Sequence, residues 1–266
     1  MHIHFLDPYR GGQSPVHCTD ARVKFVLTVA FILTAALIPI GAWPIYVLLL
    51  AMVISLIILS GVGVGYVLKR AALAFPFVLA ALPLIFTTPG LQLFSLTLGT
   101  WEITVTLPGV ERFFSIALKS WISVQAAILL TTTTQFPDIL TAMRAVRVPR
   151  LLVAIIGLMW RYIFVLADEA IRLMRARAAR SGETDVPGHR KGGRISWRAQ
   201  TAGGMAGNLF IRSIERSDRI YVAMLSRGYD GELRTMPLRE LEASNWIVLI
   251  IGGGILILLV ALSLLI

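Results

Sequence analysis

Two short segments centred on arginine have the composition of docking sites. Ala179-Arg180-Ser181 and Ser226-Arg227-Gly228 each place an arginine between small residues where a basic, helix-like stretch ends. A guanidinium binds a carboxylate through two parallel hydrogen bonds, and small neighbours leave it free to enter a groove on another protein. One such segment would be explained by the attraction between a helix C-terminus and a cation. Because there are two, at the ends of successive basic helices, we predict that both dock to a partner.

Other reactive side chains form weaker patterns. His2, His4, His17 and Cys18 are of types that bind transition metals, but their spacing matches no compact site, and we predict no metal ligands among them. The sequence lacks G-x-x-x-x-G-K-[ST], H-E-x-x-H and G-x-S-x-G, so we expect no catalytic residues and no cofactor. The chain therefore cannot hold the phosphates of ATP in the usual way.

The composition indicates a membrane protein. Hydrophobic residues make up 56% of the chain and charged residues only 15%, compared with about 25% in ordinary soluble domains. Apolar runs of spanning length cover residues 25–40, 43–59, 71–88, 113–134 and 246–266, and Pro76 and Pro83 should kink the third. We predict an all-α polytopic membrane protein with about five transmembrane helices plus a cytoplasmic or interfacial helical coupling domain.

The distribution of charge predicts orientation and domains. Basic residues precede the first run, whereas residues 89–110, which we expect to form an irregular outer loop, contain no Lys or Arg. Because Lys and Arg collect on the cytoplasmic side, we place the N-terminus and the basic region in the cytoplasm, in a multi-pass protein of the cell membrane. The predicted domains are N-terminal transmembrane helices at 1–134, coupling helices at 135–240 and a C-terminal transmembrane helix at 241–266.

The segment 151–167 is apolar but has arginines on both flanks. A single crossing would place one basic cluster outside, and Arg161 would lie at the costly centre of the bilayer. We therefore predict that this segment lies in or dips into the cytoplasmic interface. A glycine-rich break at 181–194 separates a first basic helix from a second at about 196–226, in which Gly203 and Gly207 allow close crossing of another helix.

Two polar residues, Lys119 and Gln125, lie inside the apolar run 113–134. Polar side chains within a span are candidates for a direct role in transport. A lysine that reaches the interface and a hydrogen bond between helices explain them equally well. Both interpretations remain open at this point.

The two arginine segments resemble the paired signatures of a known family. They are similar to the two Ala-Arg-Gly-type motifs of the T components of energy-coupling factor (ECF) transporters, the membrane scaffolds of a class of ABC importers. Ser181 and Ser226 depart from that pattern, but both are small. Four further segments, residues 20–24, 136–140, 147–151 and 161–169, extend the likeness over nearly the whole chain and resemble in particular the CbiQ cobalt permeases.

The resemblance implies a non-catalytic scaffold that works with partners. It implies two ABC-type ATP-binding subunits, a substrate-capturing membrane S component similar to CbiM, with or without a small CbiN-like subunit, and surrounding membrane lipid. ATP hydrolysis by the partners would drive uptake of a transition-metal ion. The likeness favours cobalt for cobalamin synthesis, with nickel or a vitamin as alternatives.

Two other classes of function fit less well. A nucleic-acid-binding protein would carry zinc-finger, RNP-type or leucine-zipper patterns beside its basic block, and the sequence has none. A membrane enzyme acting on lipids would need a cluster of acids or histidines, whereas the acidic pair Asp168-Glu169 has neighbouring structural partners in Arg161 and Arg172. Copurification separates an enzyme from a scaffold, because only a scaffold should recover ATPase subunits.

The topology can be tested by thiol labelling. In a Cys18→Ser background, we expect a cysteine at Gln92 to react with an impermeant thiol reagent in intact cells, and one at Arg194 to react only after permeabilisation. Labelling at Arg194 but not at Gln92 in intact cells would invert the assignment.

Overall fold

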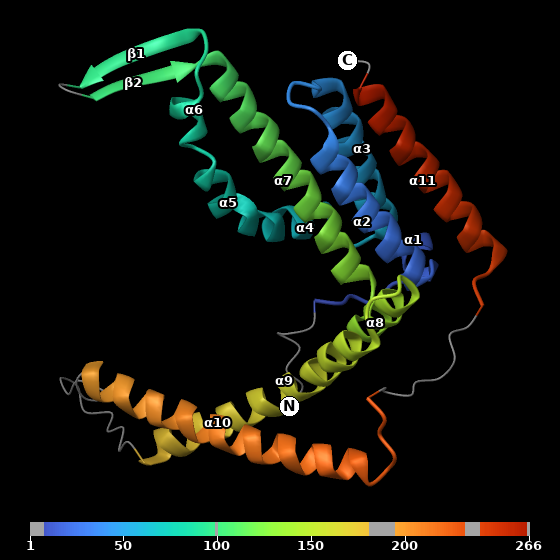
Figure 1. Ribbon diagram of the computed structural model, residues 1–266, viewed down its shortest axis with the longest axis vertical. Helices are drawn as coiled ribbons and strands as arrows, with labels where there is room; N and C mark the ends of the chain where they lie inside the picture. The colour runs from blue at the N-terminus through green and yellow to red at the C-terminus, as the bar shows by residue number, and fades with distance from the viewer. Residues whose placement is uncertain (1–7, 99–100, 181–194, 232–239, 265–266) are drawn as a thin grey trace. The chain divides into compact units, whose positions relative to one another are not determined.

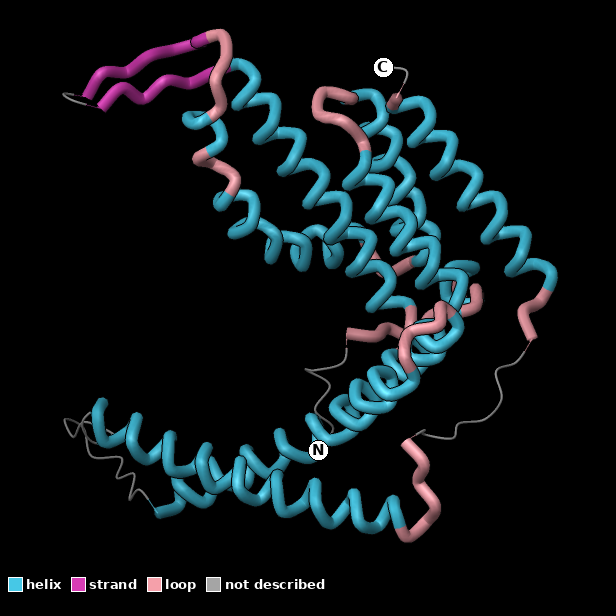
Figure 2. Tube along the Cα trace, viewed as in Figure 1, coloured by secondary structure: helices cyan, strands magenta, loops and turns pink. Residues whose placement is uncertain are grey.

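The computed structural model (Figure 1) describes residues 8–98, 101–180, 195–231 and 240–264. It divides into two compact units, the first formed by Met1–Val146 with Leu238–Ile266 and the second by Arg147–Pro237. Most of the described residues are helical (Figure 2), which confirms the predicted all-α polytopic membrane fold. The division of function at residues 135–240 stays a prediction, and the second compact unit begins slightly later, at Arg147.

The first unit contains most of the elements. They are α1 (Pro15–Cys18), α2 (Ala21–Leu37), α3 (Trp43–Ser60), α4 (Val64–Ala71), the 3-10 turn η1 (Ala72–Ala74), α5 (Phe75–Ala80), α6 (Leu84–Thr87), β1 (Gln92–Leu98), β2 (Trp101–Thr106), α7 (Leu107–Thr133), α8 (Phe136–Ala145) and α11 (Ala243–Ser263). The second unit contains α9 (Arg150–Arg180) and α10 (Ile195–Leu225).

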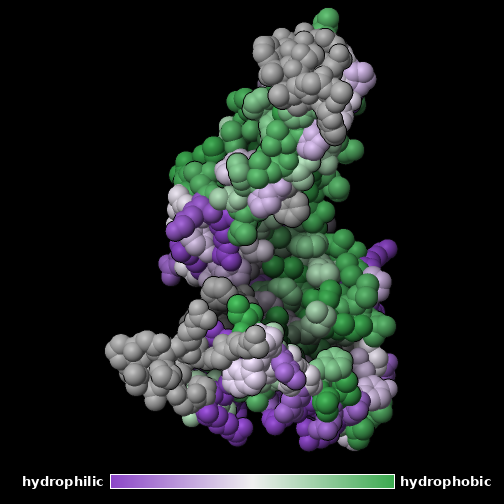
Figure 3. All heavy atoms as spheres, turned by 90° about the vertical axis from the view of Figure 1, so that its left-hand side faces the viewer, coloured by the Kyte–Doolittle hydropathy of each residue, from purple (hydrophilic) through white to green (hydrophobic). Residues whose placement is uncertain are grey.

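Five helical segments among the described residues are long and apolar enough to cross a membrane. They are α3, the broken segment Val64–Thr87, α7, α9 and α11. The predicted first span corresponds to α2, whose 17 residues give about 25 Å, the short end of the spanning range. Apolar side chains cover large parts of the face shown in Figure 3, as expected for a surface that meets lipid. The number of segments thus equals the predicted five, but it includes α9 where we expected α2.

Glycine and proline interrupt the chain where the sequence indicates. Gly61 and Gly63 have positive φ angles of 70° and 92°, conformations that glycine adopts without steric cost, and they form the turn between α3 and α4. Pro76 lies in the first turn of α5, and Pro83 is the N-cap of α6. The predicted third span is therefore a series of short helices, in agreement with the expected kinks.

The prediction that residues 89–110 are irregular was wrong, whereas their position outside the membrane stays a prediction. Residues 92–106 form an antiparallel hairpin of β1 and β2, with Leu96 opposite Ile103 and Leu98 opposite Trp101. Apolar and polar residues alternate along this segment with the period of a strand, which allows each strand to present one face. Thr106 then accepts a hydrogen bond from the backbone N–H of Gly109 and caps α7.

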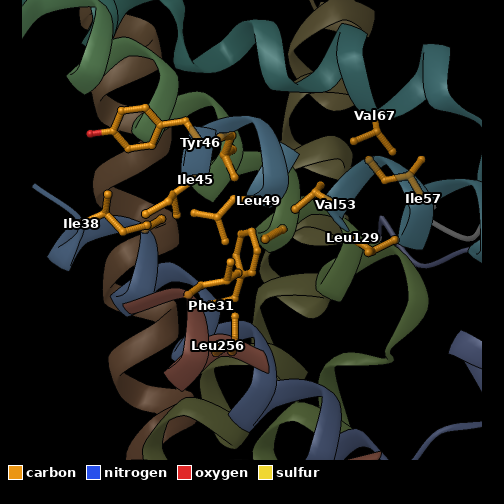
Figure 4. Packing of buried hydrophobic residues seen from close by; sticks show 14 of the residues in the cluster. Phe31, Ile38, Ile45, Tyr46, Leu49, Val53, Ile57, Val67, Leu129 and Leu256 are labelled. Carbon is orange, nitrogen blue, oxygen red and sulfur yellow. The ribbon is translucent and has the colours of Figure 1, made fainter. Parts of the chain in front are cut away.

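The core of the first unit is one face of α3. Ile45, Leu49, Val53 and Ile57 recur every fourth residue and are almost fully buried. Figure 4 shows this row beside Phe31 of α2, Leu129 of α7 and Leu256 of α11, which belong to the same cluster. Because lipid is as apolar as these side chains, close packing rather than exclusion from water holds such helices together.

The structure makes α9 one continuous helix of 31 residues, about 46 Å long. Its apolar first half, 151–167, contains Arg161, which is exposed. Length and composition would allow this helix to cross a bilayer. The flanking arginines still favour a position at the interface.

We expect both ends of the 151–167 segment to lie on the cytoplasmic side. In a Cys18→Ser background, cysteines at Val148 and Arg172 should both be protected from an impermeant thiol reagent in intact cells, and both should react after permeabilisation. Reaction of one but not the other in intact cells would show that α9 crosses the membrane.

Candidate functional site

A single carboxylate joins the two helices of the second unit. Glu169 of α9 binds two arginines of α10: its Oε1 lies 3.1 Å from Nη1 of Arg212, and its Oε2 lies 3.0 Å from Nη2 of Arg216. The two arginines are four residues apart and so lie on one face of α10. Arg212 also donates from Nε to Asn208 at 3.1 Å, which orients its guanidinium. Glu169 therefore fixes the point at which the helices cross.

The energy of this bridge is limited by solvent. The side chain of Arg212 is 52% exposed and that of Arg216 is 31% exposed, whereas Glu169 is 18% exposed. Exposed ion pairs contribute little to stability, because water screens their charges and two long side chains must be held in one geometry. The bridge is thus a means of fixing register more than a large source of stability.

The contacts on either side of the crossing show that α9 and α10 are antiparallel. Near the end of α9, the guanidinium of Arg177 lies 5.8 Å from the ring centre of Trp197, near the start of α10. Near the start of α9, Leu151 lines the same groove as Tyr229, just after α10 ends. The two arginine segments therefore lie at opposite ends of the pair.

Each arginine segment closes its helix. Arg180 is the last residue of α9 and is exposed, as is Ala179; Ser181 lies outside the described residues. Along the helix axis, Arg180 is about 16 Å from Glu169, and Arg227 is roughly as far from Arg216. The two guanidinium groups thus extend to opposite sides of the crossing.

Glycine ends α10 immediately after its arginine. Gly228 has a φ of 79°, and the backbone N–H of Tyr229 donates to the carbonyl of Met224 at 3.0 Å, the closure typical of a helix that ends in a left-handed residue. Ser226 donates from its hydroxyl to Ala223 at 2.9 Å, so its side chain folds back on the helix. Arg227 is left exposed between two small residues.

Gly203 and Gly207 lie on a different face of α10 from the contact with α9. Both are exposed, and a Cβ atom added at either position would meet nothing within 4 Å among the described residues. The α9 crossing involves Arg212 and Arg216 instead. The predicted close approach of another helix at these glycines stays a prediction.

An apolar groove of about 970 Å³ separates the first half of α9 from the second half of α10. The wall from α9 includes Ile155, Met159 and Ile163, which are between 44% and 64% exposed. The wall from α10 includes Tyr221 and Leu225, at 53% and 49%. Such a surface is suited to an apolar partner.

Of the residues whose types could bind a metal, His17 has structural partners. Both ring nitrogens of His17 are hydrogen-bonded, Nδ1 to Ser14 at 2.7 Å and Nε2 to the carbonyl of Arg10 at 3.0 Å. Among the described residues, no three His, Cys, Asp or Glu side chains form a group that could hold a metal. His2 and His4 lie outside the described residues.

Lys119 and Gln125 differ in their surroundings. Nζ of Lys119 donates to the carbonyl of Ile38 and, at 3.4 Å, to that of Ala36, so it caps the C-terminus of α2. Gln125 is 1% exposed, and within the described part of the chain its side-chain amide has no hydrogen-bond partner. The hydrogen bonds of Lys119 therefore support a structural role for this residue.

Sequence reasoning missed the bridge at the crossing. We assigned Asp168-Glu169 to partners on the same helix, Arg161 and Arg172, whereas the ion pairs of Glu169 run to α10. The spacing of Arg212 and Arg216 by four residues was the available signal. This spacing places two arginines on one face of α10, but it does not identify the acidic residue that binds them.

Comparisons with known proteins identify the family. The family model of CbiQ, cobalt transport protein, matches residues 12–237. The chain is 29% identical to the cobalt transport protein CbiQ of Rhodobacter capsulatus, covering 71% of this chain and 72% of that protein. It is 26% identical to the energy-coupling factor transporter transmembrane protein EcfT of Ruminiclostridium cellulolyticum, covering 93% and 91%. A putative fused cobalt transport protein CbiMQ of Methanocorpusculum labreanum is 26% identical and matches 94% of this chain and 41% of the fusion.

These matches cover both units, including the bridged pair α9 and α10 and the arginine that ends each of those helices. The chain belongs to the CbiQ cobalt transport protein family.

Proposed function

We propose that the chain is the T component of an ECF-type importer and couples ATP hydrolysis by two ABC-type subunits to uptake of cobalt. The observation that carries this proposal is the antiparallel crossing of α9 and α10, with an exposed arginine at each outer end. Two outward arginines suit two ATP-binding subunits, because each can enter the groove of one of them. Membership of the CbiQ family supports a role in cobalt transport.

The proposed mechanism is a lever with its fulcrum at Glu169. When the two ATP-binding subunits close on ATP, they move Arg180 and Arg227 relative to each other. The bridge of Glu169 to Arg212 and Arg216 keeps the helices in contact, so that displacement of their ends rotates one helix against the other. Because the crossing point is fixed, movement of the helix ends changes the angle between α9 and α10. The chain then transmits this rotation to its membrane helices.

The groove between α9 and α10 is the proposed contact for the substrate-capturing membrane subunit. Its walls are apolar and partly exposed, which suits contact with a membrane helix. The walls belong to α9 and α10, so the groove changes shape when the angle between these helices changes. The relative named as a fused CbiMQ protein supports a CbiM-like partner, because its name combines CbiM and CbiQ in one chain. A small CbiN-like subunit is compatible with this arrangement. That subunit selects the substrate, which we propose is cobalt because of the family. Nickel or a vitamin is the alternative.

Reversing the charge of either terminal arginine should abolish uptake. Arg180→Glu or Arg227→Glu leaves a carboxylate of the partner unpaired and adds repulsion, a loss of about 2–5 kcal/mol in binding. We expect cobalt uptake by cells and recovery of ATPase subunits to fall together, while the amount of scaffold in the membrane stays normal. The double variant should be little worse than either single one.

Arg198→Glu is the control for a change of charge at the end of the pair that carries Arg180, because Arg198 is exposed near the start of α10, which lies beside the end of α9. It should retain uptake and ATPase recovery. Normal uptake by the Arg180→Glu, Arg227→Glu double variant would remove the coupling role of both arginines.

A polar residue in the groove should weaken capture of the membrane partner. Ile163→Asn places an amide on the groove wall, where an unpaired polar group costs about 1–3 kcal/mol on burial. Val165→Asn alters a similarly exposed residue of α9 outside the lining. We expect tandem purification of the Ile163→Asn variant to recover the ATPases without the substrate-capturing subunit. The Val165→Asn variant should recover both. Equal recovery from both variants would contradict this use of the groove.

A further inference from the structure

Lys24 of α2 caps the C-terminal end of α7. Its Nζ donates to the carbonyl of Thr133 at 3.0 Å and to that of His17 at 3.5 Å. The backbone N–H of Arg10 donates to the neighbouring carbonyl of Thr132 at 2.9 Å. The last carbonyls of a helix have no partner within it, so these donors from elsewhere in the chain satisfy the end of α7.

The same lysine faces the beginning of α8. Thr134 is extended, with φ −133° and ψ 131°, and α8 starts two residues later with Asp138 in its first turn. α2 packs against α8, and the negative charge of Asp138 at the start of α8 attracts the ammonium group of Lys24. The ammonium group therefore interacts with both sides of the corner formed by Thr134 and Gln135.

This corner lies on the path between the two units. The chain continues from α8, which ends at Ala145, into the second unit at Arg147. A movement of the second unit that follows the chain through residues 146–147 and α8 reaches the long helix α7 by way of this corner. If the corner bent freely, the movement would be absorbed there.

We infer that Lys24 is a positioning residue for energy coupling, which holds α7 and α8 as one body so that movement of the coupling helices reaches the membrane helices. The inference rests on the proposed function, and it adds a residue outside the coupling helices to the mechanism. Lys24 touches no substrate in it. Its effect is exerted through the carbonyl of Thr133 and the charge of Asp138.

The chain offers a control of the same chemistry at the other end of the same helix pair. Lys119 of α7 caps the carbonyls of Ile38 and Ala36 at the end of α2. The two helices thus cap each other reciprocally. Lys119→Met removes one helix cap, as Lys24→Met does, but leaves the corner with α8 intact.

The test uses the complete complex in liposomes, with ATP hydrolysis and uptake of radioactive cobalt measured together. We expect Lys24→Met to lower the cobalt taken up per ATP by about tenfold or more, as loss of a charge-assisted hydrogen bond allows. Lys24→Arg should restore most of this ratio. Lys119→Met should leave it near the wild-type value.

Hydrogen exchange at residues 134–138 gives a second measure that needs no cargo. During ATP turnover, these amides should exchange faster in Lys24→Met than in the wild type or Lys119→Met. Equal uptake ratios and equal exchange for the two methionine variants would overturn the inference and leave Lys24 a purely structural cap.

The wild-type complex separates the two hypotheses. ATP hydrolysis without cobalt uptake would contradict the proposed substrate, and the exchange measurement would then decide the role of Lys24. Absence of ATPase subunits from the wild-type preparation would contradict both the proposed function and this inference.

Discussion

The second unit depends on the bridge by which Glu169 of α9 holds Arg212 and Arg216 of α10. Near the crossing and beyond it, α9 carries Arg172, Arg175, Arg177 and Arg180, and α10 carries Arg212, Arg216 and Arg219. Without a counter-charge these helices would repel each other at their point of contact. Glu169 accepts hydrogen bonds from Arg212 and Arg216 and so permits a close crossing. Arg180 and Arg227 lie away from this crossing and are exposed.

The exposure of that bridge suits a moving joint. A carboxylate held by two guanidinium groups keeps its bonds over a range of helix angles, since each arginine has several donors and a long side chain. A tightly packed apolar contact would resist the same rotation, because close-packed surfaces fit in few arrangements. The groove beside the crossing therefore can change its width while the helices stay in register at Glu169.

The first unit has the opposite character. Its core is a row of fully buried side chains on α3, and α2 and α7 cap each other through Lys24 and Lys119. At Gly252, α11 approaches α2 so closely that a Cβ would lie 2.9 Å from Leu27. These contacts make a rigid body out of helices that lipid would otherwise allow to slide. In the proposed mechanism, the first unit moves as a rigid body and the second unit supplies the joint.

Sequence patterns predicted the features that depend on neighbouring residues. Apolar runs predicted most of the membrane helices, and Pro76 and Pro83 predicted the breaks in the third span. The glycine-rich segment before residue 195 predicted the start of α10. The hairpin was missed because its alternation is short. The bridge at Glu169 and the cap by Lys24 were missed because each joins residues far apart in the chain, for which local periodicity carries no signal.

The most direct test of the lever is the distance between two spin labels on the same side of the crossing, one on each helix. Leu152 precedes Glu169 on α9, Val222 follows Arg216 on α10, and both are exposed, so cysteines there can be labelled in a Cys18→Ser chain. For antiparallel helices that cross at Glu169, pulsed electron paramagnetic resonance on the complex with its ATPases should give one distance of roughly 15–20 Å before ATP is added. With ATP and vanadate, that distance should shift by several ångströms, because a change in the crossing angle moves helix ends on the same side apart or together. An unchanged distance during ATP trapping, in a complex that still transports, would contradict the lever.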